Sequence, residues 1–325
     1  MTAAAGSCCV AISLTLGANP TLALLIATTT VFSIVAGATV VVENALNAAR
    51  YRREIACFRA TQQWLGYALA AALTWVWPSA ATAMLGFAFA ALVTAACELA
   101  LVANRMPTFR RLSDQHTCEP TWVGAIRRYA RPYERWAVFQ WLQASCDRWL
   151  LAGLAAPAEV GAYAAAYQLG YSSIVFLAVC IGQIVEPAIY ARAGAVGDPA
   201  RLDQADRLRR CATLCFGVLA GLCVAAAWRW HEPIVRLLLD PAYRPASGLL
   251  PWLASAASLF GLAQLYSIRW LIRLQPERTQ PARIFASLLG VLLMAGGAAL
   301  AGAGGVAAAQ VGFSLLYFIW IVALR

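Results

Sequence analysis

The chain has 325 residues, of which 62% are apolar and only 12% are charged. This composition excludes an ordinary soluble domain and is typical of an integral membrane protein. The formal net charge is +10, and all 25 basic residues are arginines. Because these arginines lie in short clusters between apolar runs, the positive charge indicates membrane topology, and we expect no nucleic-acid partner.

Apolar runs long enough to cross roughly 30 Å of hydrocarbon, about 20 residues each, recur along the whole chain. Their Ala, Leu, Val and Gly content favours helices over the alternating strands of a barrel. We therefore predict an all-α integral membrane protein with about ten transmembrane helices. In chain order the predicted spans are residues 2–17, which is a short run, then 22–42, 55–77, 80–102, 126–154, 160–190, 211–228, 249–269, 284–300 and 306–324.

The longest polar stretch, at residues 104–120, separates these spans into two groups. A weak internal repeat supports this division, because a basic turn and two spans close each group. If the two groups are repeats, the first is incomplete and lacks its opening pair of helices. The predicted parts are a first transmembrane lobe at residues 1–104 with about four helices, a cytoplasmic linker at 105–124, and a second lobe at 125–325 with six helices.

The arginine positions predict the orientation of the chain in the membrane. With a cytoplasmic N-terminus, only Arg148, Arg229, Arg236 and Arg244 lie on or near the outer side, and the other arginines lie at the inner surface. An excess of positive charge on the cytoplasmic side is the usual bias of membrane proteins. We therefore predict that both termini are cytoplasmic.

The sequence offers no pattern of a catalytic or metal site. Its ten cysteines are scattered without a CxxC pair, and His116 and His231 have no partners at ligand spacing. Neither a phosphate-binding Gly loop followed by Lys nor a Ser/His/Asp set occurs in the sequence. We therefore expect no catalytic residues, no metal, no cofactor and no enzymatic activity.

The clearest candidate site lies on the predicted helix at residues 126–154. Trp136, Gln140, Gln143 and Asp147 follow the spacing i, i+4, i+7, i+11, which places them on one helix face. A polar stripe in a membrane helix is expected to face other helices or a water-filled cavity rather than lipid. We therefore expect the Gln140, Gln143 and Asp147 side chains to serve a functional site.

Three arginines flank this stripe. Arg131 and Arg135 extend the helix at its cytoplasmic end, where snorkelling to the interface accounts for them. Arg148 points about 100° away from Asp147 on a helical wheel. The sequence leaves open whether Arg148 anchors the helix at the interface or contributes positive charge to a cavity.

Tyrosines recur every four residues on the next predicted helix, at Tyr163, Tyr167 and Tyr171. We expect Tyr163 to lie in an interfacial aromatic belt, which is the common place for tyrosine near a helix end. Tyr167 and Tyr171 lie deeper in the predicted span. They are candidates for substrate contact.

Two acidic residues of the first lobe lie close to the ends of predicted spans. Glu43 shares a helix face with Asn47 and Arg50. This pattern is typical of a polar helix end that reaches the membrane interface, and a substrate contact is the alternative. Glu98 is also expected at the interface.

Three stretches of the chain carry a resemblance to a known family. In DRWLLAGLAAPAEVGAYAAAYQLGY, the pair Asp147 and Arg148 and two leucines precede a small-Pro-x-x-Val-Gly-x-Tyr turn. Two further stretches are EPIVRLLLDPAYRPASGLLPWLA, from Glu232, and AGAGGVAAAQVGFSLLYF, around Gly304. On these motifs the chain resembles the polysaccharide-exporter branch, the Wzx-type O-antigen and exopolysaccharide flippases, of the multidrug/oligosaccharidyl-lipid/polysaccharide flippase superfamily.

The resemblance implies two six-helix lobes around a central cationic cavity, so the first two helices are missing from this chain. It further implies a transporter of the bacterial inner membrane that flips a lipid-linked oligosaccharide of the undecaprenyl-pyrophosphate type by alternating access. The implied partners are that glycan lipid, the bilayer, a glycan polymerase and glycosyltransferases. Arginines suit such an anionic cargo through bidentate bonds. The hypothetical substrate-binding residues are Arg131, Arg135, Gln140, Gln143, Asp147, Arg148, Tyr167 and Tyr171.

Three alternatives stay open. A drug or small-cation exporter of the same superfamily requires acidic rather than basic cavity residues. An O-antigen polymerase or ligase usually carries a large outer loop, whereas the longest predicted outer loop here is residues 229–247. A truncated remnant that does not transport is the third alternative.

Overall fold

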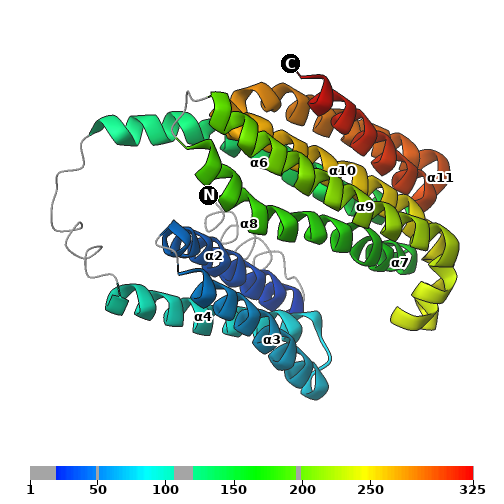
Figure 1. Cartoon of the computed structure of the whole chain (residues 1–325). Coiled ribbons are helices and arrows are strands. Elements are labelled where there is room, and N and C mark those ends of the chain that lie inside the picture. The colour runs from blue at the N-terminus through cyan, green and yellow to red at the C-terminus, as the bar shows by residue number, and fades with distance from the viewer. Residues whose placement is uncertain (1–19, 49–50, 106–119, 195–198, 325) are drawn as a thin grey trace. The chain divides into compact units, whose positions relative to one another are not determined.

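In the part that the structure describes, the chain consists of helices with short turns between them, and no strand occurs there. This confirms the predicted all-α class (Figure 1). The chain divides into two compact units, Met1–Glu119 and Pro120–Arg325. The structure, a computed structural model, describes residues 20–48, 51–105, 120–194 and 199–324.

The described part of the first unit contains three long helices, α2 (Pro20–Ala48), α3 (Arg52–Val76) and α4 (Ala80–Arg105). Helix α4 packs against both α2 and α3. A Cβ added at Gly86 of α4 would lie 2.5 Å from the backbone nitrogen of Ala70 on α3. The two backbones therefore approach each other closely, as small residues permit in membrane helix pairs.

These helices coincide with the predicted spans at 22–42, 55–77 and 80–102. The predicted span at 2–17 lies outside the described residues. Pro78 separates α3 from α4, and the side chain of Ser79 accepts a hydrogen bond of 3.2 Å from the backbone N–H of Thr82. This bond satisfies an early donor of α4, in the manner of an N-cap.

The second unit is built from longer helices with three short irregular ones between them. Its π-helix η1 continues directly from α7 into α8, and its two 3₁₀-helices η2 and η3 precede α10 and α11. The elements are α6 (Pro120–Leu154), α7 (Pro157–Tyr167), η1 (Gln168–Ser172), α8 (Ser173–Ala193), α9 (Pro199–Leu238), η2 (Pro241–Leu249), α10 (Leu250–Leu271), η3 (Pro276–Thr279) and α11 (Gln280–Ala323).

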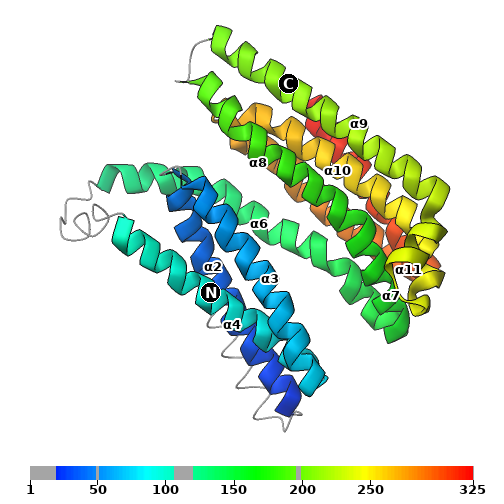
Figure 2. The ribbon, with the colours of Figure 1, turned by 60° about the horizontal axis from the view of Figure 1, so that its bottom comes forward.

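Helix α10 forms the centre of the second unit. It packs against α8, α9 and α11 (Figure 2), and most of its residues are buried. A Cβ added at Gly261 would lie 2.5 Å from the ring of Phe216 on α9. Because the glycine has no side chain, α10 leaves space for the large buried ring of Phe216, and α9 and α10 pack closely at this point.

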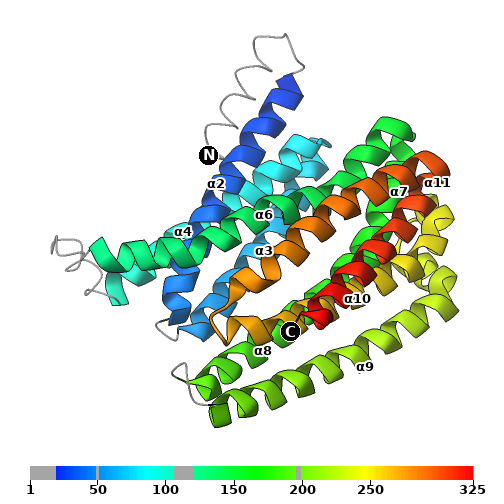
Figure 3. The same cartoon turned by 90° about the horizontal axis from the view of Figure 1, so that it is seen from above.

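Helix α11 is a tight hairpin of two helical arms that lie side by side (Figure 3). The chain reverses at Ala301 and Gly302, and the latter has φ +56°, a left-handed conformation that glycine adopts without steric cost. Close to the turn, the backbones of Gly297 and Gly305 are in contact, with no space for a Cβ on either. The two arms match the predicted spans at 284–300 and 306–324.

Two segments predicted as polar loops are largely helical, and these predictions were wrong. The segment predicted at 191–210 belongs to α9 from Pro199 onward, and that predicted at 229–247 continues α9 and then forms η2. The N-terminal part of α9 is stabilised by Asp206, which pairs with Arg209 at 2.7 Å and Arg210 at 3.1 Å. Such pairs at i+3 and i+4 support a helix even where charge density suggests a loop.

In the described part of the chain, 6 helical segments are long and apolar enough to cross a membrane. Large apolar side chains face outward, such as Phe176, Leu222 and Leu292. The protein is therefore a multi-pass membrane protein. Helices α3 and α6 carry more polar residues and are not among the six, so the count of ten spans stays a prediction. The segments are Thr21–Glu43, Ala80–Asn104, Pro157–Ala193, Pro199–Leu238, Pro241–Leu271 and Pro276–Ala323.

Candidate functional site

Asp147 is buried in the second unit, with only 1% of its surface exposed. Its Oδ2 accepts a hydrogen bond of 2.9 Å from the hydroxyl of Tyr163, and its Oδ1 accepts one of 2.8 Å from the backbone N–H of Arg148. These donors offset part of the cost of burying the carboxyl group. The inward orientation predicted for Asp147 from the polar stripe is what the structure has.

Tyr163 was predicted to lie in an interfacial belt, and this prediction was wrong. Its side chain is fully buried, and its hydroxyl holds Asp147 across the turn between α6 and α7. Pro157 opens α7 directly after that turn, and its fixed φ suits the first position of a helix. The start of α7 is thereby placed so that Tyr163, in its second turn, meets Asp147.

Arg148 is half-buried, and its guanidinium carbon lies 4.5 Å from the centre of the Tyr167 ring. Stacking on an aromatic face is favourable for a guanidinium and leaves its N–H edge free for an anion. Within the described residues, no salt bridge involves either Arg148 or Asp147. The two adjacent charges therefore serve separate contacts, one with Tyr163 and the other with Tyr167.

The three tyrosines of α7 and η1 form a buried stack. The ring centres of Tyr163 and Tyr167 are 6.1 Å apart, and those of Tyr167 and Tyr171 are stacked at 4.7 Å. The π-helical turn at Gln168–Ser172 keeps the Tyr171 ring over the Tyr167 ring, and such turns often occur at functional sites. The predicted candidates Tyr167 and Tyr171 thus lie together with Arg148.

The aromatic stack continues from η1 into α10 and α11. The ring of Tyr171 lies 6.2 Å from that of Phe260, which in turn lies 5.7 Å from Tyr317 and 6.3 Å from Phe313. Gln310 of α11 is also buried, and its Oε1 has no hydrogen-bond partner among the described residues. A connected row of aromatic rings with polar edges therefore runs through the interior of the second unit.

A small internal cavity adjoins this row and is lined by both predicted glutamines, Gln140 and Gln143 of α6. It has room for about one water molecule. Gln143 is buried, and its Nε2 has no hydrogen-bond partner in the described part of the chain. The other lining residues are Phe260, Gln264, Arg283, Ser287, Phe313 and Tyr317.

Arg283 was missed as a site residue in the sequence. It is buried, donates a hydrogen bond of 3.1 Å to the Ser267 hydroxyl, and borders the cavity. The sequence places it at the end of a basic stretch, which was interpreted as an inner membrane surface. Its spacing gave a usable signal, because Arg283, Ser287, Gly290 and Met294 follow one helix face, and all four are buried.

Arg131 is exposed, and it takes no part in the hydrogen bonds and ring contacts that the described residues form around Asp147. The side chain of Arg135 lies outside the described part of the structure. The structure therefore brings Asp147, Arg148, Tyr167 and Tyr171 together. It places Gln140 and Gln143 at the adjoining cavity.

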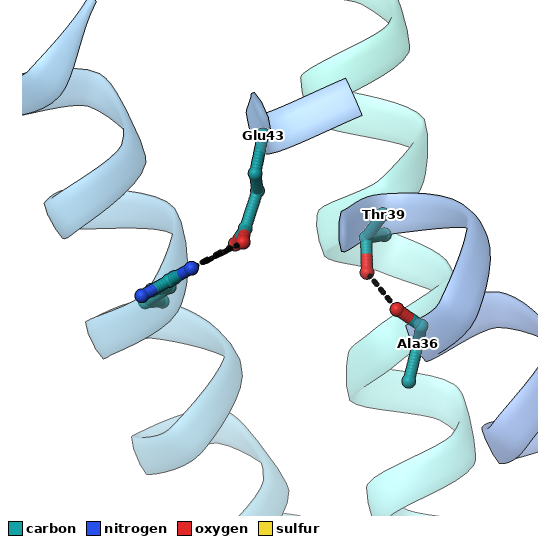
Figure 4. Close-up of polar contacts among 4 residues, drawn as sticks. Ala36, Thr39 and Glu43 are labelled. Atoms are coloured by element: carbon teal, nitrogen blue, oxygen red, sulfur yellow. Dashed lines mark hydrogen bonds and ion pairs between the residues drawn. The ribbon is translucent and has the colours of Figure 1, made fainter. Parts of the chain in front are cut away.

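The first unit holds a separate buried charge cluster. Glu43 of α2 and Glu98 of α4 are 7% and 1% exposed, so both side chains are buried, and their position at the membrane interface stays a prediction. The guanidinium of Arg59 on α3 donates to both Glu43 oxygens, with a shortest distance of 2.7 Å. Figure 4 shows the Glu43 side chain in this contact. Oε2 of Glu98 has no hydrogen-bond partner among the described residues. Glu43 is therefore paired with Arg59, whereas Glu98 takes part in no salt bridge among the described residues.

No three His, Cys, Asp or Glu side chains gather as metal ligands would in the parts of the chain that the structure describes. No protein-family model matches the chain, and no curated protein or solved structure matches it either. The assignment of a function therefore depends on the residues themselves.

Proposed function

We propose that this membrane protein is a transporter that flips a lipid-linked oligosaccharide across the bacterial inner membrane by alternating access. The observation that carries the proposal is the buried Asp147 beside a guanidinium stacked on Tyr167, within the stretch that resembles the Wzx-type exporters. Charged groups are rare inside membrane proteins and mark pathways for cargo or ions.

Arg148 supplies the cationic group that a pyrophosphate-linked cargo requires. Its planar guanidinium can form two parallel bonds to phosphate oxygens, and its stacking on Tyr167 holds its plane in place. Arg131, exposed on the same helix, and Arg135 would attract the anionic head group before it enters. Gln140 and Gln143 provide hydrogen-bonding groups for sugar hydroxyls.

The cavity beside Gln140 and Gln143 has room for only about one water molecule, so it is too small for an oligosaccharide in the described conformation. Transport by this chain therefore requires a second conformation in which α6 and α7 open. The Asp147–Tyr163 hydrogen bond, which joins these helices, is the contact that would break in that transition. A ligand shifts such an equilibrium only through contacts that differ between the two states.

Complementation of a bacterial strain that lacks its own glycan flippase tests the proposal. We expect the chain to restore surface glycan, Arg148→Gln to abolish the restoration, and Arg236→Gln, an exposed control in the same unit, to leave it intact. If the chain is inserted in the membrane at normal abundance and still does not restore surface glycan, the proposal is contradicted. Full activity of the combined Arg148→Ala, Arg131→Ala, Arg135→Ala variant would contradict the part of the proposal in which these arginines attract and bind the anionic head group.

One observation favours a second candidate, the export of small organic cations. The first unit buries two carboxyl groups, of which Glu43 is paired with Arg59 and Glu98 is in no salt bridge among the described residues, and acidic interiors suit cationic cargo. Efflux of a cationic dye from cells that express the chain separates the two candidates. Dye efflux that is lost in Glu98→Gln, without restoration of glycan, would favour the cation exporter.

A further inference from the structure

Three arginines surround one tryptophan at the C-terminal end of α10. The guanidinium carbons of Arg269, Arg273 and Arg278 lie 5.5, 5.9 and 5.0 Å from the ring centre of Trp270. The ring itself is buried, with 1% of its surface exposed. One aromatic platform thus collects three positive charges from the end of a helix and the turn that follows it.

The turn after α10 is shaped to bring these charges together. The backbone N–H of Gln275 donates to the carbonyl of Trp270 at 2.9 Å, and that of Leu274 donates to Leu271 at 3.0 Å. This is the pattern of a Schellman motif, in which glycine usually takes the left-handed position. Leu274 takes it here, with φ +53°, at a cost of about 1–2 kcal/mol.

The cluster is rich in donors and poor in acceptors. From residue 269 to 278 the chain has three arginines and one carboxylate, Glu277. In the described part of the structure, neither Arg269 nor Arg273 takes part in a salt bridge. The buried Nε of Arg269 and the indole N–H of Trp270 have no acceptor there. Two donors at this helix end, one on Arg269 and one on Trp270, therefore have no acceptor among the described residues.

A fourth arginine extends the cluster along α10. Arg209 of α9 lies over the ring of Tyr266, at 4.7 Å, one helical turn before Trp270. Its Nε is bonded to Asp206, but its Nη1 is buried without a partner among the described residues. The two rings therefore carry guanidinium groups along one side of the same helix end.

We propose that this arginine–tryptophan cluster, Arg269, Trp270, Arg273 and Arg278, binds a phosphate group. Guanidinium groups bind phosphate through paired, charge-assisted hydrogen bonds, and stacking on an aromatic ring holds their planes in place for this contact. Basic pockets at the ends of membrane helices are recognised sites for the head groups of anionic lipids.

The surroundings favour the phosphodiester of a membrane lipid over free phosphate. Leu274 and Phe285 are 55% and 60% exposed, and the Phe285 ring stacks on that of Trp320 at 6.2 Å. This apolar surface follows the cluster along the chain and suits an acyl chain. The inference is independent of the proposed transport function, because the cluster shares no residue with the site around Asp147.

Binding of lipid to the purified full-length chain tests the proposal. The protein is delipidated in a non-ionic detergent, and its thermal unfolding is followed with added phosphatidylglycerol, phosphatidylcholine or inorganic phosphate. We expect phosphatidylglycerol to raise the unfolding temperature and phosphatidylcholine to have little effect. Equal stabilisation by millimolar inorganic phosphate would assign the site to free phosphate rather than to a lipid.

In the variant Arg269→Gln/Arg273→Gln, a phosphatidylglycerol concentration at least about tenfold higher should be needed for the same rise in unfolding temperature. The matched control is Arg229→Gln/Arg244→Gln, which removes the same charge from exposed residues of the same unit. Arg278→Gln changes an exposed side chain and provides a test if the double variant does not fold. The proposal would be overturned if the double variant, or Arg278→Gln in its place, responded to phosphatidylglycerol in the same way as the control.

Discussion

The hydroxyl of Tyr163 donates a hydrogen bond of 2.9 Å to Oδ2 of Asp147, and this bond joins α7 to α6 in the interior of the second unit. Both side chains are buried. A buried acceptor that loses its donor carries the full cost of desolvation. The packing of the two helices is therefore coupled to the hydrogen bonding of one carboxyl group.

Removal of the Tyr163 hydroxyl should destabilise the second unit. We expect Tyr163→Phe to lower the free energy of unfolding by about 1–3 kcal/mol, because Oδ2 of Asp147 is left without a donor. Adding Asp147→Asn should recover part of this loss, since a neutral amide is less costly to bury. Thermal unfolding of the purified chain in detergent measures both effects. Tyr67→Phe, on an exposed ring, is the control, and an equal loss there would contradict the prediction.

Arg148 and Tyr167 should be coupled energetically. A double-mutant cycle of Arg148→Gln and Tyr167→Leu is expected to give a coupling energy of about 0.5–2 kcal/mol, the range of guanidinium–aromatic contacts. The same cycle with Arg236→Gln in place of Arg148→Gln should give a coupling near zero, since Arg236 pairs with Glu232 instead. If the two cycles agree, the stacking seen in the structure makes no net contribution.

The apolar runs were sufficient to predict the helices, because each span must satisfy its own backbone hydrogen bonds in lipid. The reversal in α11 was also predictable from its glycines. The helical N-terminal part of α9 was not, since a cluster of arginines resembles an exposed loop unless the pairing with Asp206 is known. Charge density alone does not separate a polar helix from a loop.

For the site, the spacing of the polar residues on α6 predicted that Asp147 faces inward. It contained no information about which residue donates a hydrogen bond to the Asp147 carboxyl group. Tyr163 was assigned to the interface because a tyrosine near a helix end usually lies there. Its actual role depends on the angle between α6 and α7, which is a tertiary property. Arg283 illustrates the same limit, because the contact with Ser267 comes from another helix.

Arg59 should be needed to hold the buried Glu43 carboxyl group of the first unit. Arg59→Gln leaves Glu43 buried without its salt-bridge partner, and we expect a lower unfolding temperature of the purified chain. Adding Glu98→Gln should restore part of the stability, because it removes one of the two like charges. The exposed Arg53 provides the control variant Arg53→Gln. A loss in Arg59→Gln that Glu98→Gln leaves unchanged would show that Glu98 is not part of the cluster.

Two adjacent glycines of the α11 hairpin should respond in opposite ways to alanine. A Cβ at Gly305 meets the carbonyl group of Gly297, whereas a Cβ at Gly304 meets nothing within 4 Å. We expect Gly305→Ala to lower the free energy of unfolding by about 1–3 kcal/mol, because two backbones must separate. Gly304→Ala should be neutral or stabilising by up to about 1 kcal/mol, because alanine favours the helix. Thermal unfolding of both variants decides the matter, and the same change in both would show that the two arms do not touch at Gly305.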